Sequence, residues 1–569
     1  MVTLTIDGKE LQVNENMTLL GAAGKAGVDI PTLCWMKGLN DIASCRVCLV
    51  ECDGELVASC NTKVREGMVV NTGTPRVVAA RRANVETLME AHRYECGTCV
   101  RQETCALRAL ASGFNIGDTN YYLPEKAPWD ESFPLIRDAS KCIKCMRCVA
   151  ECAKVQYCSV WEFSGAGQNM NVYVKDGLTI DNAGCALCGQ CITHCPTGAL
   201  TARDDTGKVL DALLDPEVMT VVQVAPAVRS AWGEQLGLAR EEATPGRMAS
   251  ALRALGFDKV FDTDFAADLT IMEEGSEFVE FMSSDKPRPM FTSCCPGWVR
   301  FAKLHYPQFV AQLSSAKSPH QMEGAVVKNT LRAEAEEAGK RIFVVSIMPC
   351  VAKKYECDVP QLATEVGRDV DAVLTVREFD RMLRMFRVDC GALEETDWDS
   401  PLGLSTGAAT IFGRTGGVME AALRSAVFLI TGENPDFSAC DTTASTPEKP
   451  WITKELEVAG IPVRIAVASG LGNTAKLLDA IEAGEVDLDF VEIMACPGGC
   501  VGGGGQPIEF NKELATERAA NLNSLDANDT LRYSHENPDI QKLYADWIGK
   551  PLSHTSHEWL HTDQEEWDI

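Results

Sequence analysis

Hydrophobic and polar positions change their spacing along the 569-residue chain. Near the start, residues 2–6 and 10–13 alternate apolar and polar side chains on either side of Asp7-Gly8, which predicts two strands joined by a hairpin. Residues 18–26 then follow the spacing of a helix. Beyond about residue 210, short and continuously apolar runs alternate with longer helical stretches. Such alternation predicts parallel sheets with helices on their outer faces.

The region after residue 210 contains six apolar runs that we predict to be strands. They are residues 218–224, 259–261, 342–347, 372–374, 463–468 and 490–494. Predicted helices between these strands include residues 319–338, 375–386 and 474–483. From about residue 515 the chain is helical and polar. The expected fold class is therefore multidomain, with α/β and α+β parts.

Charge and composition restrict the class of function. The formal net charge is −28 and the isoelectric point is about 4.8, so binding to nucleic acid or to an anionic membrane is disfavoured. No apolar run has the length of a membrane span, and the first residues lack the basic region and apolar core of a signal peptide. We therefore expect a cytoplasmic protein.

Cysteine is the residue type that stands out, with 25 in the chain. Most of them lie two or three residues apart in tight runs, in a large chain that shows no export signal. Thiols spaced in this way hold metal better than they pair with each other. The chain is thus expected to be a reduced protein rich in iron–sulfur clusters, with zinc as the alternative.

Two groups of candidate ligands precede residue 120. The first is a long loop with three cysteines and a fourth further on, namely Cys34, Cys45, Cys48 and Cys60. The second joins one imidazole to three thiols, namely His92, Cys96, Cys99 and Cys105. Structural zinc prefers two short paired knuckles, so it suits the first group poorly, but it suits the second as well as an iron–sulfur cluster does. The chemistry of the second group leaves both metals open.

A doubled Cys-x2-Cys-x2-Cys-x3-Cys pattern follows, and it is the most specific signal in the N-terminal half. In two-cluster ferredoxins the fourth cysteine of each run ligates the other cluster. One 4Fe–4S cluster is therefore assigned to Cys142, Cys145, Cys148 and Cys195. The other is assigned to Cys185, Cys188, Cys191 and Cys152. Unrelated zinc knuckles are a weak alternative, because the same spacing occurs twice.

Three further blocks place cysteines near the ends of predicted strands, where ligands bind in α/β folds. They lie at residues 291–298, 348–356 and 492–500. Four of their thiols give the number that a cubane cluster needs, namely Cys295, Cys350, Cys496 and Cys500. Cys294 remains as a thiol that can carry protons, although a neighbouring pair of buried, apolar cysteines is the plain alternative. At these blocks the chain resembles the iron-only (FeFe) hydrogenases, whose three active-site signatures they match.

The resemblance covers nearly the whole chain and implies five domains. The first cysteine group resembles a ferredoxin-like 2Fe–2S module, and the His-x3-Cys-x2-Cys-x5-Cys group resembles the module that holds a His-ligated 4Fe–4S cluster in hydrogenases and in respiratory complex I. The implied domains are a β-grasp 2Fe–2S domain (1–78), a His-ligated 4Fe–4S domain (79–118), a two-cluster ferredoxin-like domain (138–208), a two-lobed α/β catalytic domain with parallel sheets (210–514), and a helical tail that resembles the small subunit of other hydrogenases (515–569).

The resemblance also implies the cofactors. These are one 2Fe–2S cluster, three accessory 4Fe–4S clusters and an H-cluster, in which a 4Fe–4S cubane shares the sulfur of Cys500 with a two-iron unit that carries CO, cyanide and a dithiolate amine. Cys294 would relay the proton of that amine to Glu274, Ser314 and Glu277. The two glutamates lie one helical turn apart, although composition alone is equally consistent with a solvated acidic face. Some relatives have Arg where this chain has Phe281, which leaves the outer end of the path open.

Other residues are expected to surround the two-iron unit. Lys353 is expected to donate to a cyanide ligand, since lysine is a compact cationic donor. Met348 and Met494 would pack on the unit, with ordinary core filling as the alternative. Further contacts in the family fall at Ala225, Pro226 and Phe412, the last in a Gly-rich run without the Gly-Lys-Ser/Thr ending of a phosphate loop. Ala227 replaces a serine of some relatives, so one cyanide contact is expected to be missing.

Some conspicuous side chains receive no role. Cys52 and Cys158 fall outside the ligand patterns. The histidines of the tail are expected to be surface or packing residues, because no acidic or thiol companions are set beside them. They are His535, His554, His557 and His561.

The expected function is reversible oxidation of H2, with electrons relayed through the accessory clusters. The expected partners are ferredoxin or flavin-bearing, NAD(P)-reactive subunits, together with maturation proteins. This chain has no flavin or nicotinamide fingerprint of its own, so any such chemistry belongs to partners, and an electron-bifurcating complex stays open. The alternative is a non-catalytic iron–sulfur relative that acts in electron transfer, cluster assembly or H2 sensing. Retention of Cys294 and Lys353 argues against it.

Overall fold

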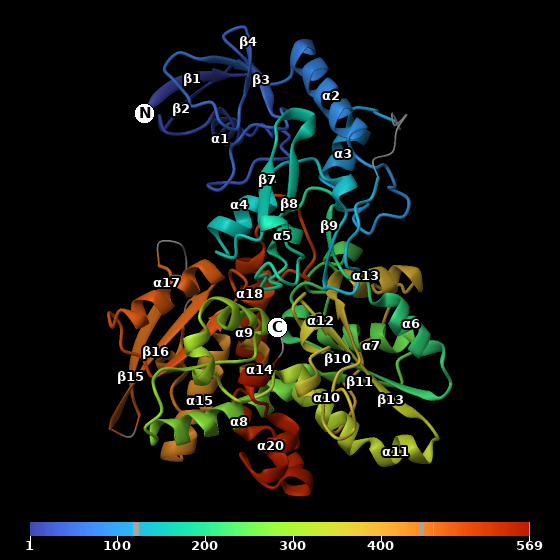
Figure 1. The fold of residues 1–569 in the computed structure, drawn as a ribbon, viewed down its shortest axis with the longest axis vertical. Helices are drawn as coiled ribbons and strands as arrows, with labels where there is room; N and C mark the ends of the chain where they lie inside the picture. The colour runs from blue at the N-terminus through green and yellow to red at the C-terminus, as the bar shows by residue number, and fades with distance from the viewer. Residues whose placement is uncertain (118–124, 443–448, 459, 568–569) are drawn as a thin grey trace.

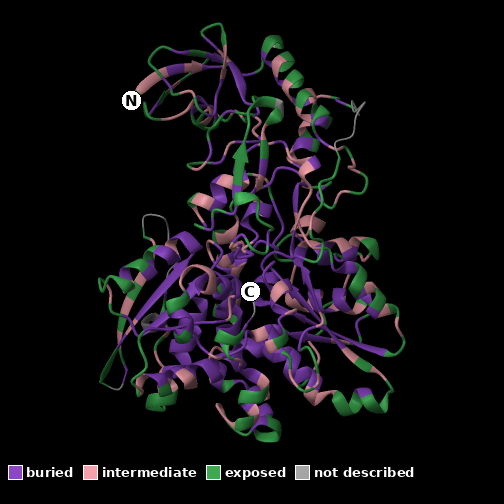
Figure 2. Ribbon diagram, viewed as in Figure 1, coloured by how far each residue is buried: buried purple, intermediate pink, exposed green. Residues whose placement is uncertain are grey.

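The computed structural model describes residues 1–117, 125–442, 449–458 and 460–567. The N-terminal segments stack above a broad body that contains both four-stranded sheets (Figure 1). Burial is most extensive in this body, whereas exposed positions are frequent in the N-terminal segments (Figure 2). Among the described residues, no helix combines the length and apolarity that crossing a bilayer requires.

The chain begins with a five-stranded sheet in the order β2-β1-β5-β3-β4. Its strands are β1 (Val2–Ile6), β2 (Lys9–Val13), β3 (Leu49–Cys52), β4 (Glu55–Ala58) and β5 (Val69–Asn71). β1 and β2 are antiparallel, which confirms the predicted hairpin, and α1 (Leu19–Lys25) follows with Thr18 as its N-cap. The cysteine-bearing loop follows α1 and leads back into the sheet at β3.

The next segment begins with α2 (Pro75–Glu90), which starts before residue 79, the expected start of the His-ligated domain. Thr74 caps the helix by accepting from Val77 N, and Pro75 at the first position is pre-set for a helical backbone. The other short elements of this region are α3 (Ala106–Gly113), α4 (Arg147–Lys154), α5 (Gln190–Thr193), and the strand pairs β6 (Leu135–Arg137) with β9 (Leu200–Ala202) and β7 (Trp161–Ser164) with β8 (Asn171–Val174).

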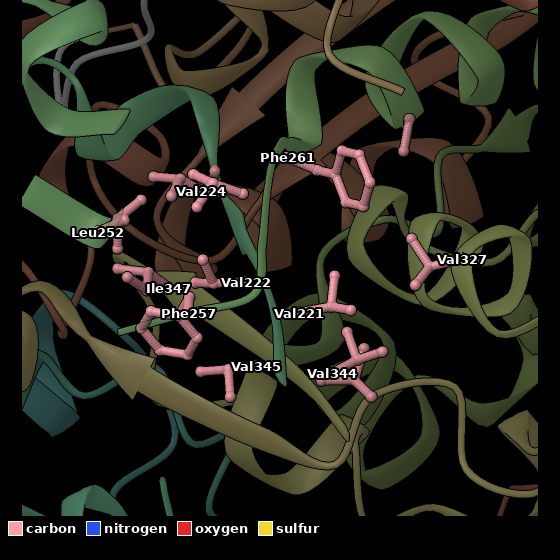
Figure 3. Close-up of a cluster of buried hydrophobic side chains, with 14 of the residues drawn as sticks. Val221, Val222, Val224, Leu252, Phe257, Phe261, Val327, Val344, Val345 and Ile347 are labelled. Carbon is pink, nitrogen blue, oxygen red and sulfur yellow. The ribbon is translucent and has the colours of Figure 1, made fainter. Parts of the chain in front are cut away.

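One lobe of the body contains a fully parallel sheet in the order β11-β10-β13-β14. Its strands are β10 (Val218–Val224), β11 (Lys259–Asp262), β13 (Arg341–Met348) and β14 (Ala372–Thr375). In register, Val222 lies opposite Val345 and Val221 opposite Val344. Helices cover both faces, with Leu252 of α7 (Pro245–Leu255) against one and Val327 of α10 (Pro319–Thr330) against the other (Figure 3). The predicted parallel strands of this lobe are confirmed.

The other lobe has a mixed sheet in the order β12-β17-β16-β15. β12 (Met290–Phe291), β17 (Phe490–Met494) and β16 (Ile461–Ser469) are parallel to one another, but β15 (Ile452–Val458) pairs with β16 in antiparallel fashion. The expectation of parallel sheets is therefore wrong at this edge. Half-buried and exposed positions alternate along β15, as in a half-solvated strand of a hairpin rather than a strand covered on both faces.

Helices surround and connect the two lobes. They are α6 (Thr206–Leu214), α7 (Pro245–Leu255), α8 (Thr263–Met282), α9 (Pro296–His305), α10 (Pro319–Thr330), α11 (Arg332–Glu337), α12 (Lys353–Glu356), α13 (Val376–Met385), α14 (Gly407–Thr410), α15 (Gly417–Thr431), α16 (Phe437–Cys440) and α17 (Leu471–Glu482). The single helix predicted over 319–338 is divided at Leu331, where α10 ends and α11 begins.

The tail packs into the body instead of extending away from it. Its helices are α18 (Ala515–Asn528), α19 (Pro538–Leu543), the π-helical turn η11 (Tyr544–Ile548) and α20 (His554–Leu560). Ile540, Leu543 and Leu560 belong to the same hydrophobic core as the parallel sheet. An isolated antiparallel bridge joins His561 to Ala316. Through this bridge the tail reaches the loop that precedes α10.

Candidate active site and metal centres

A cavity of about 80 Å³ lies where the three cysteine blocks meet. The blocks reach it because each follows the carboxyl end of a strand: β12 for the first, β13 for the second and β17 for the third. Nearly all the residues predicted for this site line it, namely Ala225, Pro226, Cys294, Cys295, Met348, Cys350, Lys353, Phe412, Met494 and Cys500. The lining is therefore a set of thiols within an otherwise largely apolar wall.

Cys496 is the one predicted ligand of this site that does not line the cavity. It is buried, and burial together with the neighbouring Cys350 and Cys295 raises the pKa of its thiol. Its Sγ also lies 3.6 Å from the carbonyl oxygen of Cys188, in the two-cluster segment. The structure thus brings all four predicted cubane ligands into one neighbourhood and places one of them at the border with that segment.

The Gly-rich run after Cys500 explains how the backbones come so close. A Cβ atom at Gly505 would lie 2.7 Å from the backbone of Pro349 and Cys350. One at Gly504 would lie 2.6 Å from the carbonyl oxygen of Cys188. Only glycine fits at these two approaches. The run therefore joins the loop that carries Cys350 to the loop that carries Cys188.

The chemistry of the four thiols fits an iron–sulfur cubane. Burial is the first cause that raises the pKa of each of the four thiols, and it takes that of Cys350 to about 11. Four bare thiolates would be strongly disfavoured in such surroundings, whereas bound iron compensates their charge and keeps them deprotonated. The donor set and its apolar setting therefore suit a metal cluster.

Lys353 is held at the cavity by a buried carboxylate, which in turn contacts a histidine. Its Nζ donates to the carbonyl oxygen of Cys294 at 3.1 Å and pairs with Glu356 at 2.8 Å, while His320 Nε2 lies 2.5 Å from the same Glu356 oxygen. Burial and the Lys353 charge lower the pKa of His320 to about 4. Burial would raise the pKa of Glu356, but Lys353 and His320 outweigh it and hold the value at about 2. The structure adds Glu356 and His320 to the site; the sequence offered only the proximity of Glu356 to Lys353 as a signal.

The predicted relay residues lie next to one another behind Cys294. Glu274 is fully buried in α8, and neither carboxylate oxygen makes a hydrogen bond of regular geometry. Burial, followed by the charge of Glu277, raises the pKa of Glu274 to about 8, although nearby Ser314 and the Ser293 backbone oppose the rise. Ser314 Oγ donates to Glu277 at 2.6 Å. Burial and Glu274 also raise the pKa of the Cys294 thiol.

The surroundings of Glu277 contain residues that the sequence pattern does not single out. Ser315 donates to Glu277 from its backbone N–H at 3.1 Å and from its Oγ at 3.0 Å. Phe281 is buried one turn further along α8. Ser315 in turn contacts His561 of the tail at 2.9 Å. These residues are far apart in sequence and belong to common residue types, so no local motif marks them.

The first cysteine group is buried beside the N-terminal sheet. Its members are mutually close: Cys34 and Cys45 interact through their side chains, as do Cys48 and Cys60. Cys52 lies on β3 instead, where its Sγ is 3.7 Å from Asp53. The Asn40 side chain donates both to the carbonyl of Cys34 at 2.6 Å and to that of Cys145 at 2.9 Å. Asn40 therefore joins the first group to one half of the cysteine repeat.

The His92 group lies against the same half of the repeat. His92 Nδ1 is 2.9 Å from the carbonyl oxygen of Lys141. Donation there places the lone pair on Nε2, the arrangement that a metal-ligating imidazole adopts. Cys105 caps α3 by accepting from Arg108 N, and Cys99 lies close to Gly198, where a Cβ atom would meet its Sγ at 2.7 Å. The group is thus fixed to segments that precede and follow the repeat.

The cysteine repeat surrounds two cavities of about 20 Å³ each. One is lined by Cys142, Cys145, Cys148 and Cys195. The other is lined by Cys152, Cys185, Cys188 and Cys191, with Cys158 as a fifth cysteine. Each cavity combines three cysteines of one run with the last cysteine of the other, and Trp161 lines both. Within the described ranges, no three His, Cys, Asp or Glu side chains close in tightly enough for a single metal ion.

Family models match consecutive parts of this chain. The model described as "Iron only hydrogenase large subunit, C-terminal domain" matches residues 218–504. The others are described as a 2Fe-2S iron-sulfur cluster binding domain (1–75), the NADH-ubiquinone oxidoreductase-G iron-sulfur binding region (81–120), a 4Fe-4S dicluster domain (141–199) and the iron hydrogenase small subunit (512–564).

Similar proteins cover the chain along its length. The NADP-reducing hydrogenase subunit HndD of Solidesulfovibrio fructosivorans is 45% identical over 99% of this chain and 98% of its own, and iron hydrogenase 1 of Clostridium pasteurianum is 37% identical over 99% of both. The solved structure of FeFe hydrogenase HydA1 from Chlamydomonas reinhardtii has a TM-score of 0.56 and 40% identity, covering 63% of this chain and 98% of that one. With the thiol-lined cavity, these matches show that the chain belongs to the FeFe hydrogenases, oxidoreductases that oxidise H2 and reduce protons at an H-cluster with the help of accessory iron–sulfur clusters.

Proposed function

We propose that the H-cluster of this enzyme is held by Cys295, Cys350, Cys496 and Cys500, with Cys500 as the shared ligand. The single observation that carries this proposal is the meeting of all three cysteine blocks at one cavity, with an unpartnered buried glutamate behind it. When bound, the H-cluster supplies the redox-active iron at which H2 is cleaved. The protein's part is to bind the cluster, to keep water out, and to deliver protons and electrons.

The wall of the cavity performs the first two tasks. Met348, Met494 and Phe412 provide apolar contact, and the tight turn at Ala225 and Pro226 closes one side. Lys353 supplies a fixed positive charge suited to an anionic ligand of iron. Because Glu356 pairs with Lys353 and His320 is neutral, the ammonium group is held in one position without an unbalanced charge.

Cys294, Glu274, Ser314 and Glu277 are proposed to carry protons between the cavity and the outside. The buried Glu274 is suited to this because its pKa of about 8 lets it accept and release a proton near neutral pH. Ser314 Oγ bonds Glu277 directly, and Glu274 needs only a small movement, or one intervening water, to reach Ser314. A proton can therefore pass along this row of side chains without any ionised side chain entering the cavity.

Four accessory clusters are proposed to form a forked electron path. The 2Fe–2S cluster at Cys34, Cys45, Cys48 and Cys60 and the His-ligated cluster at His92, Cys96, Cys99 and Cys105 would both adjoin the 4Fe–4S cluster at Cys142, Cys145, Cys148 and Cys195. Asn40 supports the first contact and the Lys141 carbonyl the second. Trp161 lies between this cluster and the one at Cys152, Cys185, Cys188 and Cys191, whose Cys188 carbonyl contacts Cys496.

The grouping of these cluster sites along the chain supports our proposal of five domains. Their boundaries are 1–78, 79–118, 138–208, 210–514 and 515–569. Residue 118 and residues 568–569 lie outside the described residues. Two branches at the N-terminal end offer two places for electron exchange with other proteins. Because HndD is named as a subunit of an NADP-reducing hydrogenase, we propose flavin-bearing, NAD(P)-reactive subunits as partners here, with ferredoxin as a further electron carrier.

Infrared spectroscopy of anaerobically matured protein tests the proposal, in the region where iron-bound CO and cyanide absorb. Bands are expected for the wild type, where they shift under H2, and also for Cys294→Ala, which leaves all four cubane ligands in place. Cys500→Ser is expected to lack the bands. Wild-type protein with full iron content but no bands, in a host that matures other hydrogenases, would contradict the assignment of the H-cluster.

A further inference from the structure

His561 of the tail lies between two carboxylates of α8. Its Nδ1 is 2.9 Å from Ser315 Oγ, and that hydroxyl is 3.0 Å from Glu277. Its Nε2 is 3.1 Å from Glu273. A continuous row of polar atoms thus leads from Glu277 through Ser315 to His561. It starts at the point where the proposed proton path otherwise ends, beside the apolar Phe281.

The backbone fixes this arrangement as firmly as the side chains do. Lys317 N donates to the Leu560 carbonyl and Thr562 N donates to the Ser315 carbonyl, each at 2.8 Å. The resulting bridge sets His561 opposite Ala316. His561 is only 7% exposed. Its contact with Ser315 is therefore a built feature of the interface between tail and body, not a chance approach of a surface side chain.

Glu273 is buried and is surrounded by donors. Tyr544 Oη donates at 2.6 Å, Ser556 Oγ at 2.7 Å and Leu552 N at 3.0 Å, in addition to His561. Burial would raise the pKa of Glu273, but these donors outweigh it and hold the pKa below its usual range. The carboxylate thus stays ionised beside the imidazole.

The other ionisable groups that face His561 come from α20, α8 and η11. The ring of His557 lies 4.6 Å from that of His561, measured between centroids, and His557 is exposed. Glu277 faces His561 only through Ser315. Tyr544 of η11 faces it only through Glu273. Apart from Glu273, no described charge is in direct contact with the imidazole, and its outer side meets a solvent-exposed histidine.

We propose that His561 is the outer relay residue of the proton path, so that the tail completes the route from the cavity to solvent. The inference rests on the proposed relay through Glu277. A proton moves from the Glu277 carboxyl to Ser315 Oγ, while the proton already on that hydroxyl passes to His561 Nδ1. His561 Nε2–H stays on Glu273, so the imidazolium that forms is paired with a carboxylate. The proton then leaves Nδ1 for water beside His557, while Nε2–H remains on Glu273, and the row returns to its first state.

The test uses full-length, matured enzyme. His561→Gln keeps a donor for Glu273 and an acceptor for Ser315 but cannot take up a proton, so we expect H2 oxidation to fall about tenfold and its pH dependence to change. In His561→Ala the rate of H2 oxidation is expected to fall likewise and to recover when imidazole is added. In Ser315→Ala the rate is expected to fall without recovery in imidazole, because this substitution interrupts the row of polar atoms before it reaches His561. His554→Gln, at an exposed position of α20, is the matched control and is expected to behave as wild type.

A second readout does not depend on turnover. In infrared spectra recorded against pH, the protonated-carboxyl band that disappears in Glu277→Gln is expected to titrate at a different pH in His561→Gln than in wild type. A purely structural role would leave this band unmoved. The CO and cyanide bands are expected to be unchanged in all these variants, which separates a relay defect from loss of the H-cluster.

Two outcomes distinguish this inference from the proposal on which it rests. If Glu277→Gln loses activity but both His561 variants keep the wild-type rate and pH dependence, protons leave directly from the half-buried Glu277, and the role of His561 is disproved. If Cys294→Ala and Glu277→Gln also keep full activity, the whole relay is disproved. Should His561→Gln unfold, a lack of imidazole recovery in a folded His561→Ala would equally overturn the proposal.

Discussion

At the scale of single residues, this protein tolerates several buried carboxyl groups that have no regular hydrogen-bond partner. Glu274 and Glu323 are both fully buried, and all four of their carboxylate oxygens are unpartnered. Burial is the first cause of a raised pKa in both residues. Only Glu274 has a relay neighbour, Ser314, next to it. A comparison of Glu274 with Glu323 therefore separates the energetic effect of burying a carboxyl group from its use in proton transfer.

Glu274→Gln is expected to stabilise the chain and to inactivate it. The folded-state pKa of about 8 lies above the ordinary value of 4.5, so the folded state binds more protons and wild-type stability falls as pH rises between these values. At about 1.4 kcal/mol per pH unit, the Gln variant should exceed wild type by up to about 4 kcal/mol at pH 8 and match it below pH 4.5. Urea denaturation of unmatured protein measures this, and H2 oxidation should fall at least about a hundredfold.

Glu323→Gln is the control for that experiment. It should show a similar gain in stability above neutral pH, because burial opposes ionisation at this position as well. Its hydrogenase activity should stay at the wild-type level. Equal loss of activity in both variants would mean that any change of a buried carboxyl in this region disturbs the site, and Glu274 would lose its special role.

Cys158 leads to a second prediction at this scale. It lines the same cavity as Cys152, and its side-chain contact with that thiol is the first cause that lowers the pKa of Cys152, while its own Sγ donates to the Gln156 carbonyl oxygen at 3.3 Å. A polar neighbour of a ligand sulfur raises the reduction potential of an iron–sulfur cluster. Cys158→Ala should therefore lower the potential of one accessory 4Fe–4S cluster in an EPR-monitored titration. Cys357→Ala, which removes another buried thiol bonded to a backbone carbonyl, should leave all potentials unchanged.

The grouping of the proposed metal ligands could be predicted from the sequence, whereas the contacts of the proposed outer relay could not. Thiols two or three residues apart signal a cluster by themselves, since the short spacing is part of the ligand geometry. Ser315 and His561 are separated by 246 residues, and His561 and Glu273 by 288. Serine, histidine and glutamate are common residues, and no spacing rule connects positions so distant. The expectation that the tail histidines only pack or face solvent fits His554, but it overlooked this contact.

At the scale of elements, most strands and helices near the site could be predicted, because apolar runs of five to eight residues mark buried parallel strands. β10 and β17 match their predicted ranges of residues. β15 was not predicted, since its side chains alternate and its partner is decided by a hairpin, not by apolar content. Approaches between loops, such as that of Gly504 to Cys188, depend on the assembled fold and carry no periodic signal.

Gly504→Ala tests how that approach affects electron transfer. A Cβ atom would lie 2.6 Å from both the Cys188 carbonyl oxygen and the Gly189 Cα, so the two ligand loops must separate. We expect H2 to reduce the accessory clusters more slowly, as followed by freeze-quench EPR, with unchanged infrared bands of the two-iron unit. Gly207→Ala in α6, where nothing lies within 4 Å, should have no effect. Normal reduction kinetics in Gly504→Ala would show that this contact does not lie on the electron path.

At the scale of the whole molecule, charge is distributed unevenly. Residues 1–208 contain 21 Lys and Arg against 24 Asp and Glu, a net charge of −3, so about −25 of the total −28 belongs to the remaining residues. The body, which contains both four-stranded sheets, is therefore strongly acidic, and the N-terminal end that bears the proposed forked cluster sites is nearly neutral (Figure 1). A redox protein of acidic surface would be repelled by the body and accepted at that end.

The overall charge predicts how artificial electron acceptors behave. A dicationic viologen is attracted to a chain of net charge −28, so its second-order rate constant in H2 oxidation should fall as salt is raised from 0.01 to about 0.5 M. A zwitterionic, sulfonated viologen of no net charge should show little change. Stopped-flow measurement of both dyes over the same salt series checks this. An equal response of the two dyes would mean that salt acts on the enzyme itself and not on the encounter.

The interface between the tail and the body has a consequence for biosynthesis. A ribosome completes Glu273 and Ser315 long before it reaches His561, which lies 288 and 246 residues further along the chain. During that interval the nascent body can fold around its sheets, since domains form as units while synthesis proceeds, but Glu273 is left without the donors that Tyr544, Ser556 and His561 later provide. The face that the tail will cover thus stays open to water until translation nears its end, which gives the cell a defined period in which an incomplete enzyme is structurally distinct from a finished one.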